Sequence, residues 1–160
     1  MPNRQQGAER EERQKVRNYR IDHEAGAQEA LFSWCDMQRG KYPELRLLYH
    51  VPNGGKRDAA TARALKRQGV KAGVPDLCLP VARGGWHGLY IELKVGSNKP
   101  TELQKQWLKS LRQQDYATAV CYGWEEAADV LKSYLDDSVL LETAATAAAV
   151  ADMPTMQPAT

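Results

Sequence analysis

Residues 73–94 decide the fold that the sequence predicts. They begin with Gly73-Val74-Pro75-Asp76-Leu77 and end with Leu89-Tyr90-Ile91-Glu92-Leu93-Lys94. Apolar runs at 77–81 and 89–95 flank a short turn with two adjacent glycines, a pattern typical of a β-hairpin. Side chains alternate between the two faces of a strand, so Glu92 and Lys94 share one face. The hairpin therefore brings a carboxylate and an ammonium group close to Asp76, at the start of the partner strand.

These residue types suit a metal-assisted hydrolysis. Asp76 and Glu92 are candidate metal ligands because Mg²⁺ and Mn²⁺ prefer oxygen donors, and the backbone carbonyl of Leu93 is a candidate third ligand. Lys94 would orient or deprotonate a water molecule, or neutralise charge that develops at phosphorus. The alternative is that Glu92 and Lys94 form a solvated pair on the strand surface and that Asp76 is a turn residue.

Four segments of the chain follow one another in a characteristic order. They are His50-Val51-Pro52-Asn53-Gly54-Gly55, then Gly69-Val70-Lys71-Ala72-Gly73-Val74-Pro75-Asp76-Leu77, then Gly88-Leu89-Tyr90-Ile91-Glu92-Leu93-Lys94, and finally Gln104. In this order they resemble the VRR-NUC family of the PD-(D/E)xK nuclease superfamily, over about residues 22–135. The resemblance implies an α/β fold with a PD-(D/E)xK restriction-endonuclease-like core, a mixed sheet flanked by helices.

The same resemblance implies a function. It points to a metal-dependent DNA endonuclease that hydrolyses phosphodiester bonds and uses Mg²⁺ or Mn²⁺ as cofactor. Similarity to short phage-type members implies a homodimer that cuts branched DNA such as four-way (Holliday) junctions. Two alternatives are a nuclease of ordinary duplex DNA and a non-cleaving DNA-binding accessory protein on a nuclease fold. The presence of Asp76, Glu92 and Lys94 together favours an enzyme.

Composition sets broad limits. The chain has 160 residues, 42% of them hydrophobic, which is enough for one domain with a buried core. The net charge of +2 is too small to indicate a nucleic-acid partner by itself. No run of about 18 apolar residues occurs, so we expect no membrane association and a cytoplasmic location in a bacterial or phage-infected cell. The three cysteines lie far apart, and we expect buried free thiols: Cys35, Cys78 and Cys121.

The two ends of the chain differ in composition from the predicted nuclease domain at 22–135. Residues 1–21 read as a charged flexible arm, because six arginines and lysines are mixed with three glutamates. Such an arm either lies along DNA phosphates or is a solvated tail. Residues 136–160 are alanine-rich and then rich in Pro, Met and Thr. We expect a largely disordered tail with a loosely held helix at 139–150.

A first helix is predicted over 22–38. Its apolar stripe consists of Ala27, Leu31, Trp34 and Cys35. Glu24 falls at the edge of this stripe, and Gln28 lies one turn later. The resemblance implies that Glu24 and Gln28 approach the metal site as supporting catalytic residues. Alternatively, Glu24 lies in the first turn only because a carboxylate there interacts favourably with the helix dipole.

A basic segment separates the first strand, predicted at 45–49, from the hairpin. Asn53 opens an Asn-Gly-Gly turn, and the resemblance implies that this loop approaches the substrate. A helix is predicted over 57–68, with Gly69 as its C-cap. Six positive charges fall within 16 residues here, on Lys56, Arg57, Arg63, Lys66, Arg67 and Lys71. They predict sequence-independent contacts with DNA phosphates, unless this surface is simply solvated.

Another helix is predicted from an N-cap at Thr101 to about residue 114. Its predicted buried face consists of Leu103, Trp107, Leu108 and Leu111. Gln104 falls inside this apolar sector, where a polar side chain needs a partner. It either completes a capping box with Thr101 or, as the resemblance implies, reaches the metal-bound water or the phosphate. A last strand at 117–122 and a closing helix at 125–135 complete the predicted domain.

Overall fold

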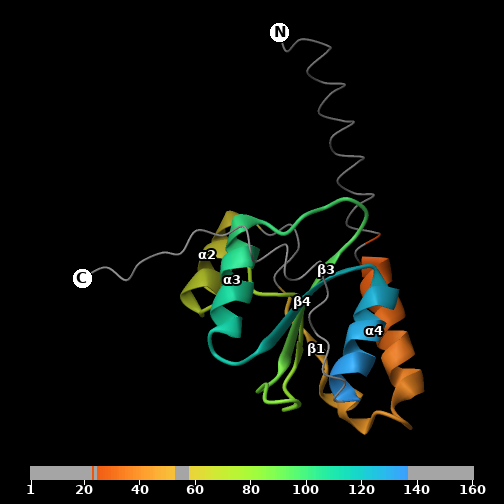
Figure 1. Cartoon of the computed structure of the whole chain (residues 1–160). Helices are drawn as coiled ribbons and strands as arrows, with labels where there is room; N and C mark the ends of the chain where they lie inside the picture. The colour runs from red at the N-terminus through yellow and green to blue at the C-terminus, as the bar shows by residue number, and fades with distance from the viewer. Residues whose placement is uncertain (1–22, 24, 53–57, 137–160) are drawn as a thin grey trace.

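The computed structural model describes residues 23, 25–52 and 58–136 (Figure 1). The predicted arm at 1–21 and the tail beyond 136 lie outside the described residues. So do four of the predicted site residues, Glu24, Asn53, Lys56 and Arg57.

In the described part of the chain, one sheet has four strands in the order β1-β2-β3-β4. They are β1 (Tyr49–His50), β2 (Leu77–Leu79), β3 (Leu89–Lys94) and β4 (Ala117–Tyr122). β2 pairs antiparallel with both β1 and β3, whereas β3 and β4 are parallel. Parallel strands need a crossover, which contains helix α3 (Glu102–Arg112). The predicted α/β fold, a mixed sheet flanked by helices, is confirmed.

Helices cover the sheet from two sides. A helix over residues 25–38 lies beside α4 (Trp124–Leu135) on one side, and α2 (Ala59–Arg67) lies with α3 on the other (Figure 1). The main core forms between the first pair of helices and the odd-numbered positions of β2, β3 and β4. Its members include Leu31, Cys35, Leu77, Leu79, Leu89, Ile91, Leu93, Ala119, Leu131 and Tyr134. Because side chains alternate along a strand, the even-numbered residues of β3, among them Glu92 and Lys94, face the other way.

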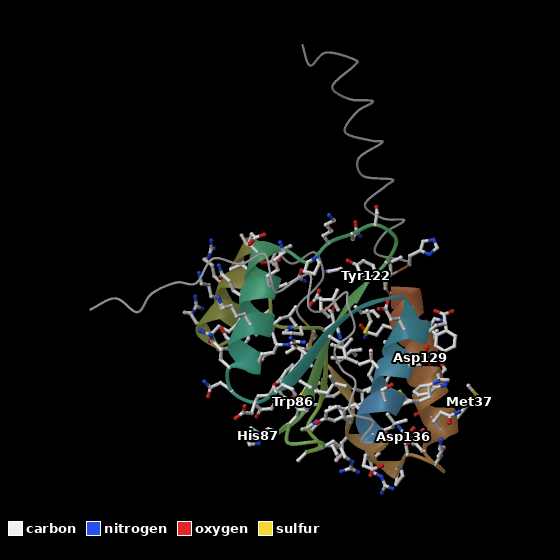
Figure 2. The ribbon with its side chains drawn as sticks, in the orientation of Figure 1. Met37, Trp86, His87, Tyr122, Asp129 and Asp136 are labelled. Carbon is white, nitrogen blue, oxygen red and sulfur yellow. The ribbon has the colours of Figure 1, made fainter. Side chains whose placement is uncertain are left out.

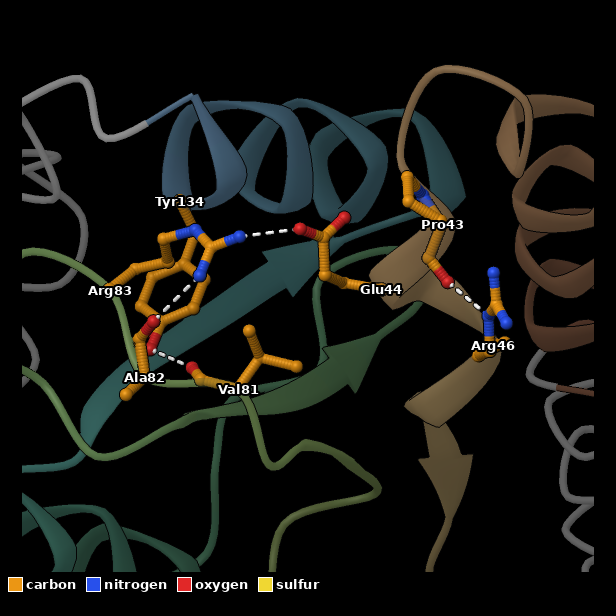
Figure 3. Close-up of polar contacts among 7 residues, drawn as sticks. All are labelled: Pro43, Glu44, Arg46, Val81, Ala82, Arg83 and Tyr134. Carbon is orange, nitrogen blue, oxygen red and sulfur yellow. Dashed lines mark hydrogen bonds and ion pairs between the residues drawn. The ribbon is translucent and has the colours of Figure 1, made fainter.

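The predicted hairpin is confirmed, with shorter strands. β2 ends at Leu79 and not at residue 81, because Pro80 has no N–H to donate to the ladder. The connection folds back where Arg83 bridges to Trp86. Tyr134 Oη of α4 donates to the carbonyl of Val81 at 2.6 Å, and an ion pair of Arg83 with Glu44 at 2.5 Å ties the connection to the segment before β1 (Figure 3). The loop between the strands is therefore anchored on two elements.

The strand predicted at 45–49 is wrong for most of its length. The chain forms a 3₁₀ helix, η1 (Pro43–Leu47), and only Tyr49 and His50 are in a strand. Three buried residues, Tyr42, Leu45 and Leu48, recur every third position, which is the period of a 3₁₀ helix. Pro43 lies in the first turn, where its ring restricts the backbone to helical φ values.

The helix predictions hold with small shifts. Leu31 and Cys35 are buried and Ala27 and Trp34 partly so, as the stripe predicts. Helix α2 starts after the N-cap Asp58, whose carboxylate accepts two backbone N–H groups at 2.9 Å. Its C-cap is residue 68, and Gly69, predicted as the C-cap, follows it with a φ of +94°. The closing helix begins one residue earlier than predicted, at 124, and the first residue of the predicted tail, 136, is its C-cap.

The predicted buried face of α3 is wrong at Leu103, which is 53% exposed, while Leu108 is buried. Leu103 lies over the chain just before β2, where a Cβ atom added at Gly73 would be 2.8 Å from the Leu103 Cβ atom. One turn further along α3, Trp107 Nε1 donates to the carbonyl of Ala72 at 3.0 Å. The first half of α3 therefore packs against the segment that leads into Asp76, which leaves Leu103 at the surface.

We expect Gly73→Ala to lower the free energy of unfolding by about 2 to 5 kcal/mol. The φ of +83° disfavours any side chain, and the new Cβ atom would also meet Leu103. The matched control is Gly69→Ala, which has a similar φ of +94° but no atom within 4 Å. It should lose only about 1 to 2 kcal/mol. Equal losses in denaturant unfolding would contradict the close packing of α3 on Gly73.

Candidate active site

The register of the hairpin brings Asp76 and Glu92 together. Leu77 pairs with Ile91, so the residue before Leu77 and the residue after Ile91 stand opposite each other on the same face. The backbone N–H of Leu93 donates to Asp76 Oδ2 at 2.9 Å, which holds the carboxylate against β3. The backbone of β3 therefore orients Asp76, one of the two predicted metal ligands.

Strand β1 holds the backbone of Asp76 from the other side. The Asp76 carbonyl accepts the N–H of Val51 at 2.8 Å and lies 3.0 Å from Nδ1 of His50. The sequence assigns no role to His50 beyond its place in a motif. His50 comes close to the Asp76 carbonyl because β1 pairs with β2. This short strand thus anchors the Asp76 backbone, although it contributes little to the core.

Glu92 is completely buried, and its two oxygens differ. Oε1 accepts two donors, Lys94 Nζ at 2.6 Å and Gln104 Nε2 at 2.5 Å. Among the residues that the structure describes, Oε2 has no hydrogen-bond partner. A buried carboxylate oxygen without a partner is unfavourable. This oxygen is therefore a position at which a cation would satisfy the site.

Burial raises the pKa of Glu92 from 4.5 to about 7. Asp76 adds to this effect through its negative charge and as a hydrogen-bond acceptor for the protonated carboxyl. The hydrogen bond and positive charge of Lys94 act in the opposite direction. At neutral pH the carboxyl is thus close to its midpoint of ionisation. A divalent cation between the two carboxylates would favour the ionised form, since metal binding displaces protons from its ligands.

Lys94 is 8% exposed, and its side chain forms an ion pair with a carboxylate that is fully buried. The alternative of a solvated pair on the strand surface is therefore wrong. The pair is covered because β3 is a central strand, flanked by β2 and β4, with helices on both sides of the sheet.

Gln104 forms the predicted capping box and also contacts Glu92. The Gln104 Oε1 atom accepts the backbone N–H of Thr101 at 2.8 Å, and the backbone N–H of Gln104 donates to Thr101 Oγ1 at 3.3 Å. These contacts complete the capping box. Its Nε2 atom meanwhile donates to Glu92. Both contacts form at once because the amide oxygen and nitrogen serve different partners, and Gln104 contacts the site through the Glu92 carboxylate.

The remaining described site residues lie further out. Gln28 is half-buried on the helix over 25–38, and within the described structure no hydrogen bond joins it to Asp76, Glu92, Lys94 or Gln104. Four predicted DNA-binding residues are exposed on or just after α2, namely Arg63, Lys66, Arg67 and Lys71. Helix α2 has no fully buried residue, and its C-terminal turn leads directly into the segment that packs on α3. The basic surface is thus connected to Asp76 through the chain between residues 69 and 76.

The donor set fits a divalent cation, although it is small. Within residues 23, 25–52 and 58–136, no group of three or more Asp, Glu, His or Cys side chains has a geometry that could hold a metal ion. The side-chain donors are the two carboxylates of Asp76 and Glu92. Glu92 has an unpartnered buried oxygen and a raised pKa. Both properties suit a position at which a cation would offset negative charge. The Leu93 carbonyl remains a predicted third ligand.

The raised pKa predicts how stability depends on pH without metal. The folded-state pKa of Glu92, about 7, lies above the ordinary value of 4.5, so the folded state keeps the proton to higher pH. This stabilisation is present below pH 4.5 and is lost as the pH rises to 7, a loss of about 3 kcal/mol. Glu92→Gln, which does not titrate, should remove that part of the dependence in chelator-treated protein. Identical pH profiles for the two proteins in chemical unfolding would show that Glu92 ionises normally.

The described cysteines Cys35, Cys78 and Cys121 are buried free thiols, as the sequence predicts. Within the described residues, no helix is long and apolar enough to cross a membrane.

Comparison with known proteins identifies the family. The family model of the VRR-NUC domain matches residues 22–125, a range that includes Asp76, Glu92, Lys94 and Gln104. A solved structure described as a VRR_NUC domain protein is 32% identical to the chain and superposes with a TM-score of 0.61. The match covers 71% of this chain and 88% of that one. No curated protein matches the chain. The predicted family is therefore confirmed: the chain belongs to the VRR-NUC family, whose members are generally nucleases.

Proposed function

We propose that this protein is a metal-dependent DNA endonuclease that hydrolyses phosphodiester bonds. The observation that carries the proposal is Glu92, a buried carboxylate with an unpartnered oxygen and a raised pKa, next to Asp76. A purely structural ion pair would not need a second carboxylate beside it, since the charge of Asp76 works against the ionised form of Glu92.

Asp76, Glu92 and the Leu93 carbonyl would hold one or two ions of Mg²⁺ or Mn²⁺. Such an ion would supply positive charge beside the phosphodiester and favour deprotonation of the attacking water. The chain itself prepares the ligands: the Leu93 N–H fixes the Asp76 carboxylate, and Gln104 fixes that of Glu92. Glu24 and Gln28 remain proposed supporting residues on the first helix.

Lys94 orients or activates the attacking water in this proposal. Its Nζ atom lies 2.6 Å from Glu92 Oε1 and on the same face of β3. The Glu92 contact positions the ammonium, and the ammonium in turn lowers the pKa of Glu92. Lys94 thus favours the charged state of Glu92, and both groups would lie where the scissile phosphate approaches Asp76.

DNA contacts would come from Asn53, Lys56, Arg57 and the basic residues of α2. Phosphate contacts of this kind give affinity without sequence preference. Similarity to short phage-type members favours branched DNA as substrate and a homodimer as the acting form, because two sites can then cut two strands. A nuclease of this kind would act in the cytoplasm of a bacterial or phage-infected cell.

The test is cleavage of labelled four-way junction, flap, linear duplex and single-stranded DNA, each with Mg²⁺ or Mn²⁺. Asp76→Asn is the matched inactive control, because the amide oxygen can still accept the Leu93 N–H. Junction-selective cutting that the control lacks would support the proposal, including its substrate. Equal cutting of linear duplex would support the nuclease and overturn its selectivity for branched DNA. Binding without cutting, in either metal, would indicate a DNA-binding accessory protein.

A further inference from the structure

A row of four side chains, two of them tyrosines, lies on the same sheet face as the candidate site. The Cα partners across the sheet are Tyr49 in β1, Cys78 in β2, Tyr90 in β3 and Thr118 in β4. Partners in adjacent strands point to the same side, and Tyr90 shares its side with Glu92, two residues further along β3. The row therefore runs beside the carboxylates across the full width of the sheet.

Aromatic contacts join this row to the loops next to it. The rings of Tyr90 and Tyr116 meet edge to face with centroids 5.5 Å apart, and His87 meets Tyr116 in the same way at 5.7 Å. His87 lies at the hairpin end of the sheet, next to Trp86 (Figure 2). Tyr49 is 49% exposed although it is a large aromatic residue, while Cys78 between the tyrosines is 3% exposed. We call Tyr49, Tyr90 and Tyr116 the tyrosine patch.

The charges around the patch suit a polyanion. A hydrogen bond with Cys78 raises the pKa of Tyr49 to about 12, so this exposed phenol is neutral. At the β4 end of the row, Arg112 Nε donates to Thr118 Oγ1 at 2.8 Å, which adds a positive charge. Helix α2, which carries the exposed residues Arg63, Lys66 and Arg67, lies on the same side of the sheet (Figure 1).

We propose that the tyrosine patch binds an unpaired nucleobase of the DNA substrate, with Tyr49 as the exposed stacking residue. This inference rests on the proposed nuclease function and gives that function a physical basis for selecting DNA structure. Inside a paired duplex both faces of a base are covered by its neighbours, so an aromatic side chain stacks more readily on a base that has left the helix. A patch of this kind therefore distinguishes branched, bulged or gapped DNA from continuous duplex.

The distance between the patch and the carboxylates fits an unpaired nucleotide next to the scissile phosphate. Two residues along a strand span about 7 Å, roughly twice the separation of stacked bases. A phosphate at Asp76 and Glu92 would thus have a neighbouring unstacked nucleotide within reach of Tyr90 and Tyr49. The exposed ring of Tyr49, at the sheet edge, is the part of the patch that such a base meets first.

The test measures DNA binding in EDTA, so that no cleavage is required. The probes are a short duplex with one bulged 2-aminopurine and the same duplex fully paired. For the bulged probe we expect Tyr49→Ala to weaken binding by about 5- to 100-fold, the range for loss of one base–aromatic stack. Binding of the paired duplex should change less than about twofold. Wild-type protein should also quench the 2-aminopurine fluorescence, and Tyr49→Ala should not.

Two further variants separate stacking from other effects. Tyr49→Phe keeps the ring and should retain both affinity and quenching. Met37→Ala removes a large hydrophobic side chain that is 75% exposed, from the helix on the opposite side of the sheet (Figure 2). This control variant should behave as wild type. Thermal unfolding of each variant checks the fold, since Tyr49 also covers Cys78.

The outcomes distinguish this inference from the proposed function. Equal losses for bulged and paired DNA, or no loss for either, would overturn the stacking role and leave the nuclease proposal intact if the protein cuts DNA. A third outcome is that Tyr49→Ala weakens binding of the bulged probe alone, wild-type protein quenches 2-aminopurine, and the protein cuts no DNA. This outcome would support the patch as a binding site and overturn the proposed nuclease function. An absence of binding to both probes would overturn the inference.

Discussion

Asp76→Asn is expected to reduce DNA cleavage by about 1,000-fold and to weaken Mn²⁺ binding by at least about 100-fold. The substitution removes one of the two carboxylate charges and leaves the side-chain volume nearly unchanged. The amide oxygen can still accept the Leu93 N–H that now holds Asp76 Oδ2 at 2.9 Å. The fold should therefore persist, and the loss should reflect the missing charge.

This substitution has a readout that does not depend on catalysis. Because the charge of Asp76 contributes to the raised pKa of Glu92, Asp76→Asn should bring that pKa back toward 4.5. The pH dependence of stability in metal-free protein should then be smaller than in wild type. Calorimetric titration with Mn²⁺ measures the binding loss directly. Wild-type affinity for Mn²⁺ together with normal cleavage would remove Asp76 from the site.

Lys94→Met is the second large effect, with an expected loss of cleavage of about 100- to 10,000-fold, the range for a general acid–base group. Methionine keeps most of the apolar stem but not the ammonium. Lys94 is 8% exposed, so it contributes little surface to DNA binding, and affinity for DNA should be nearly unchanged. Gln104 Nε2 still donates to Glu92 Oε1, which limits the structural consequences.

Raising the pH separates two possible roles of Lys94. Its charge lowers the pKa of Glu92, so in Lys94→Met that pKa should rise above its wild-type value of about 7. If Lys94 acts on the attacking water, cleavage should stay low at a pH where Glu92 is fully ionised in the variant. Full recovery of the rate in alkaline buffer would mean that Lys94 serves only to keep Glu92 charged. A pH–rate profile of both proteins makes this comparison.

Local patterns in the sequence account for much of the fold. The alternation of apolar residues in 89–94 and the N-cap at Thr101 act over a few neighbouring residues, and both are confirmed. The predicted C-cap at Gly69 is off by one residue. The strand predicted at 45–49 failed because the burial of Tyr42, Leu45 and Leu48 follows a period of three, which an apolar run such as Leu45–Tyr49 does not reveal. The exposed position of Leu103 depends on contacts with residues about 30 positions away along the chain.

The sequence by itself determined the chemistry available to this protein: two carboxylates, a lysine and a glutamine in the order of the VRR-NUC family. Only the tertiary structure decided how these groups interact. Strand register sets Asp76 against Glu92, a capping box aims Gln104 at the same carboxylate, and burial in a central strand raises the pKa of Glu92. The same strand register places Tyr49 and Tyr90 on one face of the sheet, beside the carboxylates. Solvent exclusion and pairing between distant segments arise only in the folded chain, so no local pattern carries them.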